Sequence, residues 1–284
     1  MNLNIVIMNF SGIYEEELFY QNEEVFWLDL KDISGTNCYC DEEAVDQILE
    51  RLEKCPGSGI YFIDSGNYHY MSRIGAQRVK EPFNLLVFDN HTDMQLPAFG
   101  GLLSCGGWIA SALEEVENLK EVWLIGPDEE AYSQVEEPFK DRVRFLSREE
   151  LSQMRMYHGI IQDDEKTGIN GKVQKNIEIQ DKKIRNWIQE IPAEIPLYVS
   201  IDKDVLCKEN ASTTWSQGDM TLEELLEMLT DFTTEFWKKG GRILQVDICG
   251  ECDPDESVEN NKNDHANREL LKFWKGCFER GILL

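Results

Sequence analysis

Short apolar runs and longer amphipathic stretches alternate along this chain of 284 residues. The apolar runs, rich in β-branched and aromatic residues, predict strands near residues 3–8, 25–30, 59–63, 84–89, 121–126, 142–146, 196–202 and 243–248. The stretches between them predict helices at 42–54, 70–80, 106–119, 129–137, 180–190, 221–239 and 264–280. Such alternation is typical of a parallel sheet with helices on both faces.

The pattern predicts a single α/β domain over residues 1–284. This length is sufficient to bury a large core, and no linker-like stretch divides the chain. The sixth helix should begin at Thr221, because Thr221-Leu222-Glu223-Glu224 matches a capping box. Residues 155–178, rich in Asp, Gly, Lys and Asn, indicate an insertion or hairpin.

Three potential metal ligands follow the apolar run 85–88 at alternate positions: Asp89, His91 and Asp93. Side chains of an extended segment alternate between its two faces, so these three would project in the same direction. Crowded carboxylates repel one another unless a cation or protons compensate. The alternative is a solvated loop after a strand.

A second apolar run, 196–201, ends in a similar way with Asp202 and Asp204. Ligands of open parallel sheets gather beyond the carboxyl ends of the strands, so two such ends can face one crevice. Oxygen ligands combined with imidazole suit a divalent ion such as manganese better than they suit a thiolate-preferring metal. Either acid pair alone would more often be a turn or a helix cap.

These residues carry a resemblance to a known family. The run 89–93, Asp-Asn-His-Thr-Asp, resembles the DAHxD motif of the arginase/agmatinase (ureohydrolase) family, and 200–206, Ser-Ile-Asp-Lys-Asp-Val-Leu, resembles its SxDxDxxDP motif. Gly66-Asn67-Tyr68-His69 stands where the family has GGxHS. The three motifs have the family's order and spacing, and the resemblance extends over residues 59–254.

The resemblance implies a three-layer α/β/α fold with a mostly parallel sheet of about eight strands. It also implies two manganese ions, with zinc or another divalent metal as the alternative. Asp89 and Asp202 would bridge the ions, with His69 and Asp93 completing one shell and His91 and Asp204 the other. A water held between two such ions has a pKa near 7 and attacks as hydroxide, while Asp93 accepts and relays the proton.

The departures from the family concern the substrate. Where many arginases have a shuttle histidine, this chain has Ser104, Cys105 and two glycines, and the TGTP-like loop contains Trp215. Glu251, followed by Cys-Asp-Pro, is the candidate for the acid that contacts the guanidinium group. Its alternative is a polar residue in a turn. Ser104, Cys105, Trp215 and Glu251 are therefore the predicted substrate contacts, and free arginine is not the expected substrate.

Three functions remain open on the sequence alone. The first is a dimetal hydrolase that cleaves a carbon–nitrogen bond of a guanidino or amidino compound. The second is a deacetylase-like amide hydrolase with one zinc ion, for which His69 and Asp204 would be surplus ligands. The third is a metal-binding protein without catalysis, which the missing histidine suggests.

The composition limits the classes of binding partner that we expect. A net charge of −26 disfavours nucleic acid and anionic membrane surfaces, and no apolar run is long enough to span a membrane. The partner expected is a small-molecule substrate, with a homo-oligomer left open and a cytoplasmic location as the default. Eight cysteines are too few for a disulfide scaffold. The Cys249/Cys252 pair is interpreted as buried thiols near a strand end rather than as a zinc or redox site.

Overall fold

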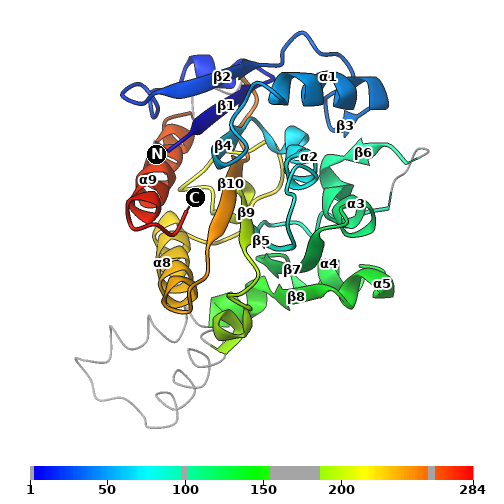
Figure 1. Ribbon diagram of the computed structural model, residues 1–284, viewed down its shortest axis with the longest axis vertical. Coiled ribbons are helices and arrows are strands. Elements are labelled where there is room, and N and C mark those ends of the chain that lie inside the picture. Colours follow the sequence, from blue (N-terminus) through cyan, green and yellow to red (C-terminus); the bar gives the residue numbers. More distant parts are fainter. Residues whose placement is uncertain (1–2, 97–100, 154–185, 255–259, 284) are drawn as a thin grey trace.

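The structure, a computed structural model, describes residues 3–96, 101–153, 186–254 and 260–283. Its centre is a sheet of eight strands, all parallel, which confirms the predicted fold class (Figure 1). In spatial order the strands are β2 (Val25–Asp29), β1 (Ile5–Asn9), β4 (Gly59–Ile63), β10 (Ile243–Cys249), β9 (Leu197–Asp202), β5 (Phe83–Phe88), β7 (Leu119–Ile125) and β8 (Val143–Leu146). All eight predicted strands are present.

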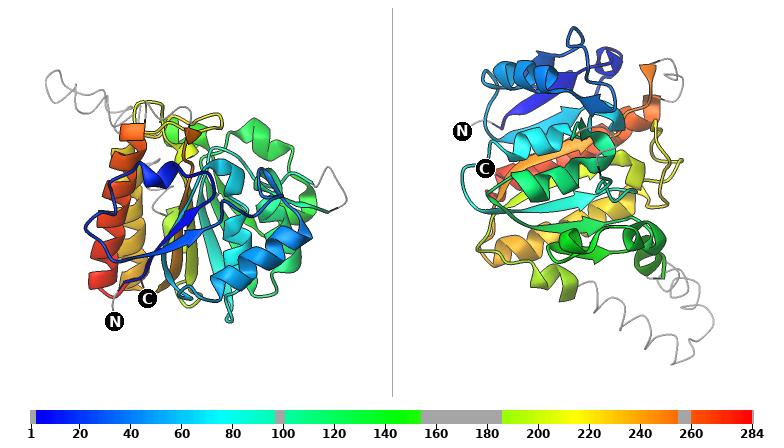
Figure 2. Two further views of the ribbon diagram at one scale, coloured as in Figure 1. Left: turned by 90° about the horizontal axis from the view of Figure 1, so that it is seen from above. Right: turned by 90° about the vertical axis from the view of Figure 1, so that its right-hand side faces the viewer.

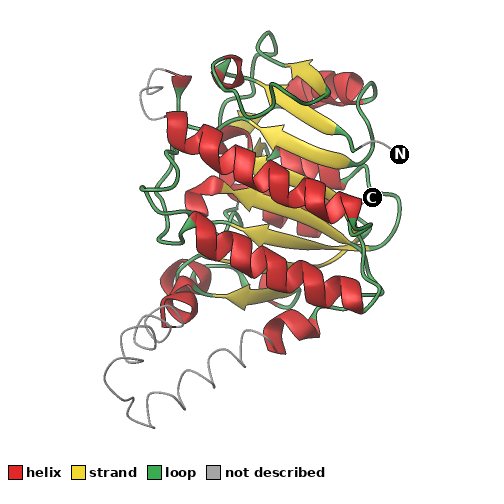
Figure 3. Cartoon of the chain, turned by 90° about the vertical axis from the view of Figure 1, so that its left-hand side faces the viewer, coloured by secondary structure: helices red, strands yellow, loops and turns green. Residues whose placement is uncertain are grey.

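Helices cover both faces of this sheet (Figures 2 and 3). One face packs against α1 (Glu42–Leu52), α2 (Met71–Ala76) and α3 (Trp108–Glu115), and the other against α8 (Leu222–Lys238) and α9 (Asn260–Glu279). Alternate residues of each strand enter opposite cores, so Ile5 and Ile7 of β1 face α8 and α9 while Val6 and Met8 face the other layer. Burial on both faces explains why the strands are continuous apolar runs.

The helices at 42–54, 221–239 and 264–280 are confirmed, and the capping box forms as predicted: Thr221 Oγ1 accepts from the Glu224 amide and the Glu224 carboxylate from the Thr221 amide. The helices predicted at 70–80 and 106–119 are shorter than expected, because α2 ends at Ala76 and α3 at Glu115. The 3₁₀ turn η2 (Gly66–Tyr68) precedes the first of them, and η3 (Cys105–Gly107) replaces the first turn of the second. The helix at 129–137 is divided into α4 (Glu129–Ser133) and α5 (Glu137–Lys140). Pro138 lacks the amide hydrogen that a continuous helix needs.

Two predicted segments reach beyond the described residues. Residues 186–190 are helical, whereas the remainder of the helix predicted at 180–190 lies outside the described part of the chain. The insertion predicted at 155–178 also lies outside it.

A second, two-stranded sheet was not predicted. β3 (Tyr39–Cys40) pairs antiparallel with β6 (Leu103–Ser104), and the pairing continues through a hydrogen bond from the Cys105 amide to the Cys38 carbonyl at 2.9 Å. Two-residue strands are too short to show a hydrophobic period. They bring the segments 38–40 and 103–105 together beside the carboxyl edge of the large sheet.

Over the described ranges, no helix combines the length and the apolar character needed to cross a membrane.

Candidate metal centre

The six predicted metal ligands meet at the carboxyl ends of the central strands. Asp89 directly follows β5, and Asp202 is the last residue of β9. These two strands are neighbours in the sheet, with Phe88 opposite Ile201, so acids distant in sequence leave the sheet side by side. His69 reaches the same place from the connection that follows β4. The parallel topology therefore produces the cluster, as the strand-end argument predicted.

One group of ligands surrounds His69. Its Nδ1 lies 3.3 Å from Asp89 Oδ2, 3.2 Å from Asp93 Oδ2 and 3.3 Å from Asp202 Oδ2. All four side chains are buried. Three carboxylate oxygens, two from the segment after β5 and one from the end of β9, thus converge on a single imidazole nitrogen, which is the arrangement of a site for a small cation.

A second group surrounds His91. Its Nδ1 lies 2.8 Å from Asp204 Oδ2 and 3.6 Å from Asp89 Oδ1. Within His69, Asp89 and Asp202, and again within Asp89, His91 and Asp204, the potential ligand atoms lie within 4.8 Å of one another. Asp89 belongs to both groups, with one oxygen directed to each histidine. Its predicted bridging position is therefore geometrically available.

Backbone amides hold the carboxylates in place. The His91 amide donates to Asp89 Oδ1 at 2.6 Å, and the Asp204 amide donates to Asp202 Oδ1 at 2.9 Å. The Asn90 amide donates to Asp204 Oδ1 at 3.0 Å. Asp89, Asp202 and Asp204 thus each have one oxygen fixed by the main chain, and their orientation does not depend on side-chain packing alone.

Serine hydroxyls contact the outer nitrogens of both histidines. His69 Nε2 lies 2.9 Å from Ser200 Oγ, which also lies 3.1 Å from Ser72 Oγ. His91 Nε2 lies 2.9 Å from Ser216 Oγ. A hydrogen bond at one ring nitrogen determines which tautomer presents the other to a metal. In both histidines Nδ1 faces the carboxylates, so the serines orient the rings for binding through Nδ1.

The acids and imidazoles strongly shift one another's pKa values. Burial, together with the negative charge of Asp89, raises the pKa of Asp93 to about 7. Burial likewise raises the pKa of Asp204, and the charge of Asp202 adds to the effect. Burial alone would lower the pKa of His91, but its contacts with Asp204 and Asp89 raise that pKa to about 12. The centre therefore favours cations, whether these are protons or metal ions.

The donor set fits a divalent metal. Asp89 Oδ2 is fully buried and has no hydrogen-bond donor among the described residues, a costly position unless a cation binds there. Burial opposes ionisation of Asp89, yet the contacts with His69 and His91 lower its pKa well below the usual range. A buried, ionised carboxylate shared by two imidazoles suits a hard or borderline ion.

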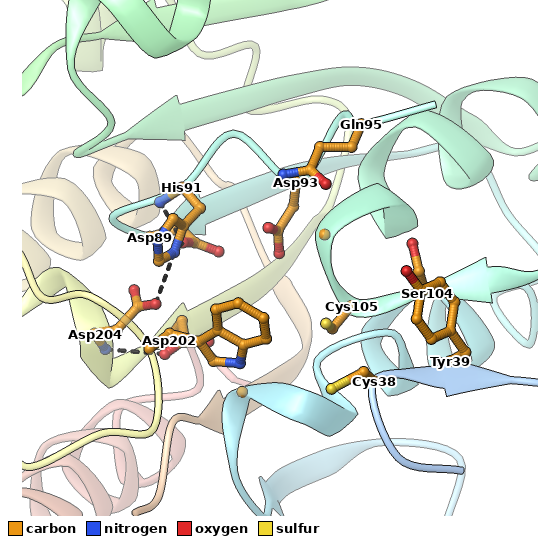
Figure 4. A pocket seen from close by; sticks show the side chains of 13 residues that line it. Cys38, Tyr39, Asp89, His91, Asp93, Gln95, Ser104, Cys105, Asp202 and Asp204 are labelled. Carbon is orange, nitrogen blue, oxygen red and sulfur yellow. Dashed lines mark hydrogen bonds and ion pairs between the residues drawn. The ribbon is translucent and has the colours of Figure 1, made fainter. Parts of the chain in front are cut away.

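A pocket of about 230 Å³ opens onto the cluster (Figure 4). Of the predicted ligands, Asp89, His91, Asp93, Asp202 and Asp204 line it. The predicted substrate residues Ser104, Cys105 and Trp215 line it too, joined by Cys38, Tyr39, Gly66, Gln95 and Gly106. In Figure 4 the labelled residues of the two small strands lie across the pocket from the acids. Apart from its metal-ligand candidates, the described lining is uncharged.

Glu251 is the predicted substrate residue that does not line the pocket. Its side chain is completely buried, forms an ion pair with Lys203 and accepts a hydrogen bond from Asn267 Nδ2 of α9 at 2.8 Å. The residue before it, Gly250, has a φ of 92°, and a Cβ there would lie 2.3 Å from Asp202 Oδ1. The chain thus turns sharply at Gly250 and directs Glu251 to α9. This position does not support the predicted contact with substrate.

All eight cysteines are free thiols in the structure. Cys249 and Cys252 are buried, and Cys249 Sγ donates to the Ser65 carbonyl at 3.3 Å. Neither belongs to the two metal-ligand groups found among the described residues. The interpretation of Cys249 as a buried thiol at a strand end is confirmed.

The fold that carries this cluster is similar to the folds of several solved structures. The chain is similar to a proclavaminate amidino hydrolase from Streptomyces clavuligerus, with a TM-score of 0.56, 15% identity, and coverage of 94% of this chain and 93% of that one. It is also similar to the formimidoylglutamase from Bacillus subtilis, with a TM-score of 0.57, 16% identity, and coverage of 96% and 86%. For an arginase from Medicago truncatula the TM-score is 0.57, with 12% identity and coverage of 95% and 84%.

The chain has the arginase fold. The resemblance predicted from three motifs is confirmed at this level, because these solved structures match the described sheet and cover nearly the whole chain. No family model matches the chain. An uncharacterized protein from Thermotoga maritima is 27% identical over 268 residues, which are 94% of this chain and 88% of that protein.

Several residues of the candidate metal centre were not predicted from the sequence. Ser200 could have been found, because it precedes Asp202 by two residues on β9 and therefore shares its face. Ser216, Gln95 and Cys38 could not, since only their loops and the small sheet bring them to the centre. Nor does any motif in the sequence indicate that Trp108 contacts Asp93.

Proposed function

We propose that this protein is a metal-dependent hydrolase that cleaves a carbon–nitrogen bond of a small guanidino or amidino compound other than free arginine. One observation carries the proposal: the two ligand groups around His69 and His91 share the buried carboxylate Asp89 beneath a pocket. The names of the solved structures with this fold, an arginase and an amidino hydrolase among them, agree with this chemistry.

The two groups are proposed to hold two manganese ions. His69, Asp93 and Asp202 would serve one ion, His91 and Asp204 the other, and Asp89 both, with Asp202 as a second bridge. When bound, such ions supply a hydroxide nucleophile at neutral pH. Zinc or another divalent metal is the alternative occupant.

The chain's own residues position the reaction. Asp93, which lines the pocket, is proposed to take a proton from the attacking water and transfer it to the leaving nitrogen. Ser104, Cys105 and Trp215 would bind the remainder of the substrate, since they belong to the uncharged part of the lining.

The deacetylase-like alternative needs only one metal, with ligands from Asp and His. The presence of His69 and Asp204 in the cluster, beyond the ligands that one zinc ion needs, is the observation that disfavours it. The non-catalytic alternative is based on the missing histidine, because the stretch where the resemblance expects one contributes Ser104, Cys105 and Gly106 to the pocket instead.

A metal analysis followed by a substrate screen tests the proposal. The purified protein, stripped with chelator and reloaded with manganese, should hold close to two ions per chain. It should then release urea or ammonia from at least one compound in a panel of guanidino and amidino compounds. One tightly bound zinc ion with hydrolysis of acylated amines would establish the deacetylase-like function instead, and metal binding without any hydrolysis would establish the non-catalytic one.

A further inference from the structure

Trp108, the first residue of α3, contacts two members of the His69 ligand group. Its side chain is completely buried, and Nε1 donates to Asp93 Oδ2 at 2.6 Å. The imidazole of His69 packs against its ring, with 4.8 Å between ring centroids and 49° between ring planes. A single side chain therefore restricts the carboxylate of one ligand and the ring of another.

Asp93 needs such a restraint because its backbone is unusual. Its φ is 47°, in the left-handed region that side chains with a Cβ rarely occupy. The Asp93 carbonyl accepts a hydrogen bond from the Ile109 amide at 2.9 Å. The beginning of α3 thus holds Asp93 at two points, its carbonyl through Ile109 and its carboxylate through Trp108.

We propose that Trp108 is a positioning residue of the metal centre. Its indole N–H fixes the direction of the Asp93 carboxylate, and its ring limits rotation of His69, so that both ligands face one ion. An indole N–H suits this purpose because it donates one hydrogen bond, accepts none and does not change charge with pH. The inference rests on the proposed metal centre and adds a residue that the family motifs do not include.

The test replaces Trp108 by Phe, which keeps an aromatic ring against His69 and removes the N–H group. The matched control is Trp123→Phe on β7. Trp123 is also buried, but its Nε1 has no hydrogen-bond partner among the described residues, and its ring packs on Trp187 rather than on a ligand. Both changes remove the same atoms from a core, so a general loss of packing should affect both variants alike.

Manganese binding to the metal-free proteins is the readout. Loss of a hydrogen-bonded partner of a ligand typically weakens metal affinity by about 10- to 100-fold. We expect Trp108→Phe to weaken one of the two binding events by that factor and to leave the other within about threefold. Trp123→Phe should bind both ions as the unaltered protein does. The paramagnetic resonance signal of a coupled manganese pair should disappear at limiting metal in the Trp108→Phe protein alone.

A double-mutant cycle separates positioning from packing. If Trp108 acts through Asp93, Trp108→Phe should change manganese affinity less than about twofold when Asp93 is already alanine. Wild-type affinity for both ions in Trp108→Phe, or an equal further loss in the Asp93→Ala background, would overturn the inference. Should the Phe variant fail to fold, Trp108→His takes its place, because imidazole restores an N–H donor and should retain more affinity than Trp108→Leu. Failure of the unaltered protein to bind manganese, zinc or any other divalent metal would refute the proposed function, and with it this inference.

Discussion

Lys203 and Glu251 form an ion pair in which neither side chain has any exposed surface. Lys203 stands between Asp202 and Asp204 in the sequence, yet its Nζ also donates to Asn267 of α9 at 2.9 Å. The 3₁₀ turn η4 (Lys203–Val205) thus presents an acid to the pocket and a lysine to the opposite layer. The pair links the turn that carries Asp204 to the core beneath it.

Removing the Lys203 side chain should therefore lower the free energy of unfolding substantially. Lys203→Met leaves a buried, unpaired Glu251, and breaking a buried pair in this way costs about 3 to 5 kcal/mol. The free energy of unfolding in urea measures this loss. In the double variant with Glu251→Gln we expect part of the stability to return, because no unpaired charge remains.

The exposed pair Lys238–Glu235 on α8 provides the control for that measurement. Lys238→Met should change the unfolding free energy by less than about 1 kcal/mol, as is usual for surface pairs. A loss equally small for Lys203→Met would contradict the role assigned to the buried pair.

The metal-free protein should become less stable as pH rises through neutrality. The folded-state pKa values of Asp93, about 7, and His91, about 12, both lie above the usual values of about 3.9 and 6.5. A group whose pKa is raised in the folded state stabilises the fold fully when the pH is below its unfolded-state pKa. This stabilisation is lost as the pH rises towards its folded-state pKa. The Asp93 contribution should thus disappear between about pH 4 and pH 7, and the His91 contribution above pH 6.5. Thermal unfolding at pH 5 to 9 in chelator, compared with Asp93→Asn, measures the first effect.

Manganese should reverse this trend by displacing protons. Because the pKa values of His69 and His91 are both raised by neighbouring carboxylates, binding at pH 7 should release at least two protons, one from each imidazole. Calorimetric titrations in buffers of different ionisation enthalpy count these protons. Binding enthalpies that do not depend on the buffer would show that the histidines are already neutral.

Asp89 should matter more for metal content than Asp204, because it belongs to both ligand groups and Asp204 to one. We expect Asp89→Asn to retain less than one manganese ion per chain and Asp204→Asn close to one. The manganese-induced rise in melting temperature should shrink in the same order. Asp231→Asn, at an exposed position of α8, is the control and should bind two ions. Equal losses in the Asp89 and Asp204 variants would argue against a shared carboxylate.

Trp215 should determine which compounds are hydrolysed. It lines the pocket with 44% of its surface exposed, and its Nε1 donates to Asn67 Oδ1 at 2.9 Å. Trp215→Ala should leave the manganese content unchanged and alter the ranking of compounds in the substrate screen. Trp237→Ala, at a similarly exposed tryptophan on α8, should change neither.

Arginine should be a poor substrate for the unaltered protein. The described pocket lining contains no lysine or arginine to meet its carboxylate, and an unmatched buried charge weakens binding. We expect a specificity constant below about 10⁴ per molar per second, under the usual enzyme range. Turnover of arginine above that value would refute the expectation.

The sequence could predict the ligands because strand geometry is local. The end of an apolar run suffices to place Asp202 and Asp89 at an edge of the sheet. The extended period of two does not continue beyond them, because Asp204 lies in the 3₁₀ turn η4 and Asp93 has a φ of 47°. The contacts of Trp108 and Glu251 could not be predicted in this way. They depend on how α3 and α9 dock against the sheet, and neither docking angle is encoded in a local period.

The proposed ligands and the proposed specificity residues are attached to the molecule in different ways. Asp89 and Asp202 adjoin hydrogen-bonded strands in the middle of the sheet, so they cannot shift without disrupting the core. Ser104 belongs to a two-residue strand, and Trp215 to a loop. Substitutions in these peripheral segments can therefore change the lining of the pocket without moving the proposed metal ligands. A change of substrate would then require substitutions only in the segments that form the rim of the pocket.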